Sequence, residues 1–127
     1  MIRKLFSMAA LAAFTVTSAA ADEVRVYNWS AYIDESLLVK FEEETGIKLI
    51  YDVFDSNELL ETKMLAGGSG YDIVVPTGDF LERQIIAGAF QPLDYDKLPN
   101  AANLWSMIKE RTAVHDPDNT YAINYMW

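Results

Sequence analysis

The sequence predicts an α/β fold with a doubly wound, mostly parallel sheet. Strand and helix patterns alternate three times between residues 24 and 88. The third strand pattern is short and apolar on both faces, which is typical of a buried strand in a parallel sheet. Because parallel neighbours need a crossover between them, this order predicts parallel strands with helices on both faces of the sheet.

The first strand and the first helix carry clear boundary signals. Residues 24–28 combine alternation with β-branched and aromatic side chains, which predicts a strand. Asp34 is a side chain that favours the start of a helix, and Gly46 stands where that helix should end. The helix between them should pack one apolar face on the sheet, formed by Leu37, Leu38 and Phe41.

The second unit repeats this order. Residues 47–53 alternate as a second strand. Asp55 with Glu58 resembles a capping box, in which two side chains satisfy the free N–H groups at a helix start. The helix that follows should carry Leu60 and Met64 on its buried face.

The third unit begins after a cluster of glycines at positions 67, 68 and 70, which should end the second helix. Residues 73–75 form the short apolar strand. A third helix is expected over about residues 80–87, because Gly88 follows as a stop signal.

The N-terminus has the order of a secretory signal peptide. Two basic residues precede an uncharged apolar run at residues 5–17, and small residues follow up to Ala21. The apolar run is too short to span a bilayer, although a membrane anchor or a buried helix is the alternative interpretation. We expect residues 1–21 to be a signal peptide and residues 22–127 to form the exported chain.

The chain is acidic and contains no cysteine. It has 10 Lys and Arg against 19 Asp and Glu, a formal net charge of −9, and two of the basic residues lie in the expected signal peptide. This acidity argues against nucleic acid or an anionic membrane as the partner and favours a cationic ligand, although solubility alone also explains most of the acids. A cysteine-free exported chain fits a bacterial periplasm.

The last seven residues, YAINYMW, form an apolar, strand-like run with no turn, cap or polar tail after it. Natural termini usually lie in exposed polar segments. We therefore expect residues 22–127 to be an incomplete domain of a longer protein.

Polar and aromatic side chains follow two strands that should be neighbours. Trp29, Ser30 and Tyr32 follow the first strand, and Thr77 and Asp79 follow the third. In doubly wound sheets the first and third strands are commonly adjacent, and ligands bind beyond the carboxyl ends of the strands where the winding reverses. Both loops should therefore face one crevice.

The chemistry of these five residues suits a small amine. An indole and a phenol offer flat faces that attract an ammonium by about 0.5 to 2 kcal/mol each. A carboxylate would add a charge-assisted hydrogen bond of about 1.5 to 3 kcal/mol. Binding is therefore the expected activity.

Each of these residues also has a purely structural interpretation. Trp29 and Tyr32 are equally typical of aromatic core residues, and Thr77 is typical of a turn. Asp79 stands three residues before Glu82 at a helix start, which is a capping arrangement worth about 1 kcal/mol. These alternatives remain open at the level of sequence.

No catalytic residue, metal site or cofactor is predicted. The sequence has no G-x-S-x-G elbow, no P-loop and no cluster of metal ligands. Its single histidine, His115, lies in the turn-like run HDPDN and is expected at the surface. An exported α/β enzyme is the alternative from a different functional class.

Beyond these patterns, four long segments resemble one known family. They are YNWSAYI, FEEETGIKLIYDVFDSNELLETKMLAGGSGYDIVVPTGDFLERQ, FQPLDYDKLPN and HDPDNTYAINYMW, which together cover most of residues 24–127. The chain resembles the periplasmic polyamine-binding proteins of bacterial ABC transporters, and FDSNE and FLERQ look most similar to the putrescine-preferring branch. The resemblance implies that residues 22–127 are the incomplete first, N-terminal lobe of a two-lobed receptor that closes on its ligand, with the second lobe missing from this chain.

The resemblance also implies roles for individual residues. Trp29, Ser30 and Tyr32 fall on the first ligand loop of the family, where aromatic side chains surround the polyamine. Thr77 falls where members often have a ligand-contacting serine, and Asp79 falls at a position that varies with specificity. One departure is Ala31, where many members carry Asp or Glu.

The expected function is thus that of a periplasmic polyamine receptor that catalyses no reaction. Putrescine is the leading ligand, and spermidine or another cationic or amino-acid-like solute is the alternative. The implied partner is an inner-membrane ABC permease, with no nucleic acid, and we expect a monomer.

Overall fold

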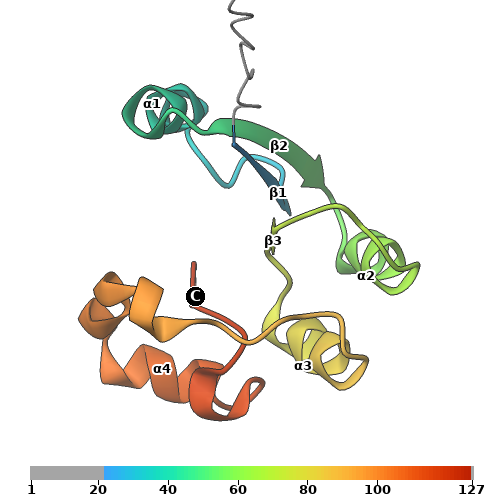
Figure 1. The fold of residues 1–127 in the computed structure, drawn as a ribbon. Coiled ribbons are helices and arrows are strands. Elements are labelled where there is room, and N and C mark those ends of the chain that lie inside the picture. The colour runs from blue at the N-terminus through green and yellow to red at the C-terminus, as the bar shows by residue number, and fades with distance from the viewer. Residues whose placement is uncertain (1–21, 127) are drawn as a thin grey trace, which may run out of the picture.

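The computed structural model describes residues 22–126, so the expected signal peptide and Trp127 lie outside the described residues. Its sheet has three parallel strands in the order β2-β1-β3 (Figure 1). The prediction of a parallel sheet with the first and third strands as neighbours is confirmed. The strands are β1 (Glu23–Trp29), β2 (Lys48–Phe54) and β3 (Ile73–Val74).

Helices alternate with the strands as predicted, and three short 3-10 helices lie before and after the last helix of residues 22–126. Because β2 and β3 lie on opposite sides of β1, right-handed crossovers place α1 and α2 on opposite faces of the sheet. The helices are α1 (Ser36–Thr45), α2 (Asn57–Leu65), α3 (Gly78–Ile86) and α4 (Ser106–Thr112), and the turns are η1 (Tyr95–Lys97), η2 (Pro99–Asn103) and η3 (Pro117–Asn119).

The core lies between the sheet and α2. Tyr27, Phe54 and Leu60 are buried together, and Leu60 has no exposed surface. Met64 and Val74 pack against them. The predicted buried face of α2 is therefore confirmed, and it packs against β1 and β2.

Two expected helix starts were wrong. The side chain of Ser56, not Asp55, caps α2, because the Ser56 hydroxyl accepts the N–H of Leu59 at 3.3 Å. Thr77 occupies the position before α3, and Asp79 is already inside the first turn. The Asp34 carboxylate does accept a hydrogen bond from the N–H of Ser36, at 2.9 Å between Oδ1 and N, and so helps to begin α1.

Two predicted core positions and one predicted strand were also wrong. Ile73 is 52 % exposed and Leu37 is 50 % exposed, because the described residues do not cover these sides of β3 and α1. Residues 121–126 form no strand. Their first N–H groups bond instead to a buried carboxylate, that of Asp116.

Asp116 holds the turn that leads into residues 121–126. Its side chain is fully buried, and its two oxygens accept the N–H groups of Thr120 at 3.1 Å, Tyr121 at 2.8 Å and Ala122 at 2.8 Å. Leu93 donates its N–H to the carbonyl of Thr120 at 2.8 Å, so the same turn is tied to the segment after α3. The exit direction of the following residues is therefore fixed.

His115 is not the simple surface residue that its sequence context suggests. Its ring is half-buried, and its Nδ1 lies 3.2 Å from a carboxylate oxygen of Glu82. The ring also lies against Gly78, where an added Cβ would come within 2.4 Å of the His115 Cδ2 atom. The absence of a side chain at position 78 thus lets this turn approach the start of α3.

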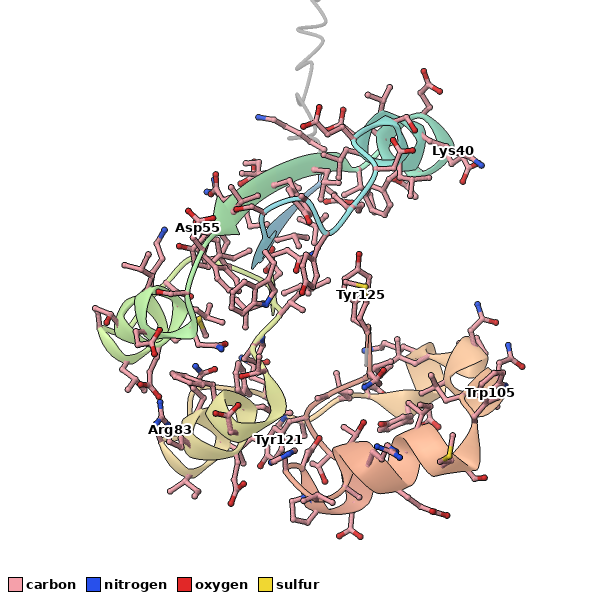
Figure 2. The ribbon with its side chains drawn as sticks, turned by 180° about the vertical axis from the view of Figure 1, so that it is seen from behind. Lys40, Asp55, Arg83, Trp105, Tyr121 and Tyr125 are labelled. Carbon is pink, nitrogen blue, oxygen red and sulfur yellow. The ribbon has the colours of Figure 1, made fainter. Side chains whose placement is uncertain are left out.

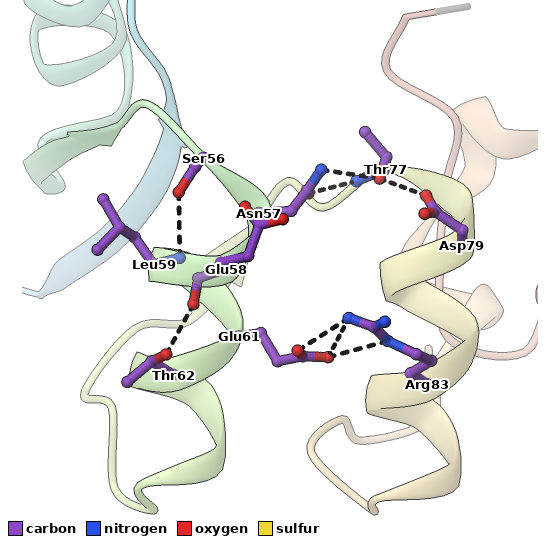
Figure 3. Close-up of polar contacts among 9 residues, drawn as sticks. All are labelled: Ser56, Asn57, Glu58, Leu59, Glu61, Thr62, Thr77, Asp79 and Arg83. Atoms are coloured by element: carbon purple, nitrogen blue, oxygen red, sulfur yellow. Dashed lines mark hydrogen bonds and ion pairs between the residues drawn. The ribbon is translucent and has the colours of Figure 1, made fainter.

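An ion pair ties α2 to α3. The Arg83 guanidinium donates to both carboxylate oxygens of Glu61, with the shorter contact at 2.8 Å (Figure 3). The same guanidinium lies 4.0 Å from the ring centroid of Phe80. These contacts help to set the orientation of α3, which Thr77 precedes and whose first turn contains Asp79.

Candidate functional site

The loops that follow β1, β2 and β3 leave the sheet at one end, which we call the carboxyl edge (residues 30–35, 55–56 and 75–77). Carboxyl ends of parallel strands meet at the same edge, and β1 lies between the other two strands. The structure thus places the end of β1 and its loop, with Trp29, Ser30 and Tyr32, beside the loop and helix start that carry Thr77 and Asp79, as the sequence predicted.

Trp29 belongs partly to the core and partly to this edge. Its indole N–H donates to the carbonyl of Val75 at 2.9 Å, which links β1 to the loop after β3. Its ring lies 4.6 Å from that of Phe54 and 6.1 Å from that of Tyr32, measured between centroids. Tyr32 is 45 % exposed. We call these two residues the aromatic ledge. Trp29 is held in place by Val75 and Phe54, whereas Tyr32 is exposed to solvent.

Ser30 is paired with an acid that the sequence analysis assigned to helix capping. The Ser30 hydroxyl donates to the carboxylate of Asp55, and the Ser30 N–H donates to the carbonyl of Phe54 at 3.2 Å. Asp55 is exposed at the end of β2 (Figure 2). A hydroxyl that donates its hydrogen to a carboxylate keeps its own lone pairs as acceptors, so this pair can accept hydrogen bonds from a cation.

Thr77 and Asp79 form a second polar group, joined to α2 by Asn57. The Asn57 amide donates to the Thr77 hydroxyl at 3.0 Å and accepts the Thr77 N–H at 3.1 Å (Figure 3). The Thr77 hydroxyl donates to a carboxylate oxygen of Asp79 at 2.6 Å. This bond is the main reason why the pKa of Asp79 lies below its ordinary value, so the exposed carboxylate is charged at neutral pH.

The first loop bends sharply at Ala31. Its φ is 58°, in the left-handed region that non-glycine residues rarely adopt. Asn and Asp tolerate this conformation better than alanine does, because their short polar side chains can bond locally. The loop that carries Tyr32 is therefore held in a conformation that alanine itself does not favour.

Three residues at or near the carboxyl edge were missed by the sequence analysis. Asp55 was interpreted as a cap, and Asn57 had no assigned role. Tyr125 was placed in a strand, yet its hydroxyl donates to the main-chain carbonyl of Tyr32. Local spacing carries no signal for such pairs, because each joins positions far apart in the chain.

Several side chains of the carboxyl edge are exposed, among them Ser30, Tyr32, Asp55 and Thr77. A hollow of about 220 Å³ lies elsewhere, at α4, lined by Trp105, Met107, Ile108 and Arg111. Within residues 22–126, no group of three or more His, Cys, Asp or Glu is arranged to hold a metal ion. None of the helices described is both long enough and apolar enough to cross a membrane.

No family model matches the chain, but curated proteins do. It is 53% identical over 120 residues to the putrescine-binding periplasmic protein PotF of Escherichia coli K12, covering 93% of this chain and 32% of that protein. It is 57% identical over 104 residues to the putrescine-binding periplasmic protein SpuD of Pseudomonas aeruginosa UCBPP-PA14, covering 82% of this chain and 28% of that protein. The chain thus spans about a third of the length of these relatives.

Solved structures give the same fold. The spermidine/putrescine ABC transporter substrate-binding protein PotD of Streptococcus pneumoniae superposes with a TM-score of 0.78 at 37% identity, over 84% of this chain and 32% of that one. The PotD-type lipoprotein Tp0655 of Treponema pallidum gives 0.78 at 35% identity, over 83% of this chain and 33% of that one. The described residues are therefore a partial α/β domain with the parallel sheet of these binding proteins.

Proposed function

We propose that this chain, a homologue of the periplasmic polyamine-binding proteins, contributes one face of the ligand site of a solute receptor that binds polyamines, with putrescine as the leading ligand. The relatives named above are substrate-binding transport proteins; two of them are named for putrescine and a third for spermidine and putrescine. The receptor would pass its ligand to an inner-membrane ABC permease, act as a monomer and catalyse no reaction.

The observation that carries this proposal is the arrangement at the carboxyl edge. An aromatic ledge, Trp29 with Tyr32, lies between two carboxylates, Asp55 beside Ser30 and Asp79 beside Thr77. Aromatic faces attract an alkylammonium and pack against its methylene groups, while the carboxylates supply opposite charge. Both carboxylates are exposed, so they can reach a ligand without being buried alone.

Export to the periplasm is part of the same proposal. The relatives are named as periplasmic proteins, and residues 1–21 have the order of a signal peptide. Sequencing the N-terminus of the protein recovered from the periplasmic fraction tests this point. We expect it to begin at Asp22.

Calorimetric titration of the full-length protein with putrescine, cadaverine, spermidine and glutamate tests the ligand class. We expect binding of the polyamines, with putrescine tightest, and no binding of glutamate. A full-length, folded protein that binds none of the three amines would contradict the proposal. Turnover of an amine, followed by the loss of free amine over time, would favour the exported enzyme instead.

Replacing Asp79 with asparagine separates its structural role from its ligand role. The substitution keeps a hydrogen-bonding side chain in the first turn of α3 but removes the charge. We expect stability to change by less than about 0.5 kcal/mol and putrescine affinity to fall about fivefold, with a larger loss at low salt. Equal affinities of wild type and Asp79→Asn at both salt concentrations would leave Asp79 only a structural role. Asp96→Asn, which removes a charge from η1, is the control.

A parallel substitution, Asp55→Asn, tests the acid beside Ser30. An exposed charge near a cation is worth about 1 kcal/mol in water, so we expect putrescine to bind about fivefold more weakly. Asp52→Asn serves as the matched control, because it removes the same charge from β2 at a residue bonded to the Tyr71 hydroxyl. If both substitutions weaken binding equally, only the net charge matters and Asp55 has no specific role.

A further inference from the structure

Residues 121–126 return toward the sheet after the Asp116 turn. The three N–H groups bound by the Asp116 carboxylate fix the direction in which the chain leaves that turn. Figure 2 shows Tyr125 extending from this segment toward the strands. We call residues 121–126 the arm; its first two residues, Tyr121 and Ala122, are held by the Asp116 carboxylate.

The tip of this arm reaches the first loop of the carboxyl edge. The Tyr125 hydroxyl donates to the main-chain carbonyl of Tyr32, a contact between residues 93 positions apart. Tyr125 is 49 % exposed, so burial alone does not hold its ring in place. Burial raises the pKa of the nearby Tyr51 phenol, and the Tyr125 phenol adds a smaller contribution in the same direction.

The loop needs such a contact. Ala31 has a φ of 58°, a conformation that persists in a non-glycine residue only when its surroundings hold it. Before Ala31 the loop is tied to β2 through Ser30, and after it Asp34 bonds to Ser36. The carbonyl of Tyr32 lies between these two ties. Fixing that carbonyl restricts the peptide plane next to the Tyr32 side chain.

We propose that Tyr125 is a positioning residue for the ligand loop: its hydroxyl holds the Tyr32 carbonyl and so keeps the Tyr32 ring beside Trp29, ready for an alkylammonium. This inference rests on the proposed function for its ligand, but the contact can be tested without any ligand. Tyr125 acts through Tyr32 and need not touch the amine.

The test compares Tyr125→Phe with wild type in the full-length protein. The substitution removes only the hydroxyl, so amide hydrogen exchange without ligand should become faster at residues 31–33. Putrescine should bind about 2- to 10-fold more weakly, the effect of one neutral hydrogen bond. Tyr95→Phe is the matched control, because the Tyr95 hydroxyl also donates to a main-chain carbonyl, that of Asn119, far along the chain from this loop. It should change neither measurement.

A double-mutant cycle with Tyr32→Ala identifies the route of the effect. If Tyr125 works by placing the Tyr32 ring, Tyr125→Phe should no longer weaken putrescine binding once that ring is absent. An equal loss in both backgrounds would overturn the proposal, as would unchanged loop exchange in Tyr125→Phe. A wild-type protein that binds no polyamine would instead refute the proposed function, and loop exchange would still decide the role of Tyr125.

Discussion

Replacing Asp116 with alanine should lower the free energy of unfolding by about 3 to 5 kcal/mol, the largest stability effect we expect from a single polar side chain. The carboxylate is fully buried and accepts three main-chain N–H groups. Without it, these donors lose a charged acceptor in a site that water enters poorly. Urea unfolding of the full-length protein, followed by circular dichroism, measures the change.

Two further variants make this result specific. Asp116→Asn retains one acceptor oxygen but turns an NH₂ group toward N–H donors, so it should also destabilise, by less than alanine does. Glu110→Ala removes an exposed acid from α4 and should change stability by less than about 0.5 kcal/mol. If Asp116→Ala matched Glu110→Ala, the three hydrogen bonds would contribute nothing to stability.

The elements that were predicted correctly are those whose signals are local. The three strands of the sheet, their parallel order and the C-terminal ends of α1, α2 and α3 follow from periodicity and from glycines such as Gly46, whose φ is 71°. The position of Trp29 and Thr77 on adjacent loops followed as well, because the strand order of a doubly wound sheet limits which loops can meet.

The mistakes at Asp55 and Asp116 share one physical cause, which is competition for polar groups from other parts of the chain. Asp55 and Ser56 are both good caps by sequence, but the Ser30 hydroxyl engages Asp55 and leaves Ser56 for the helix. Asp116 looked like part of an exposed turn, yet it is buried because the N–H groups that follow fold back onto it. In each case the hydrogen-bond partner determines the role of the side chain, and local sequence spacing does not reveal that partner.

The same reasoning explains why Tyr125 was missed. An apolar, aromatic run such as YAINYMW predicts a strand when it is considered alone. In the structure its first donors are used by Asp116 and the hydroxyl of Tyr125 bonds to Tyr32. A site built from such long-range contacts can be located by topology, while its individual contacts cannot be.

Trp29 is the residue whose loss should weaken ligand binding most. In the full-length protein, Trp29→Ala should weaken putrescine binding by about 1 to 3 kcal/mol, because both the cation–π attraction and the apolar contact are lost. Some loss of stability should accompany it, since the indole packs on Phe54 and donates to Val75. Calorimetry for affinity and thermal unfolding for stability measure the two effects separately.

Two variants, Leu60→Ala and Trp29→Phe, distinguish the contribution of Trp29 to the core from its contribution to ligand binding. Leu60 has no exposed surface in the same core, so Leu60→Ala should cost about 2 to 5 kcal/mol of stability while leaving the affinity of the folded protein nearly unchanged. Trp29→Phe keeps an aromatic face but loses the bond to Val75, and its affinity should lie between those of wild type and Trp29→Ala. A Trp29→Ala protein with a strongly lowered melting temperature and wild-type affinity would behave like Leu60→Ala. Trp29 would then be a core residue alone, and the ammonium would have to be held by the carboxylates without an aromatic face.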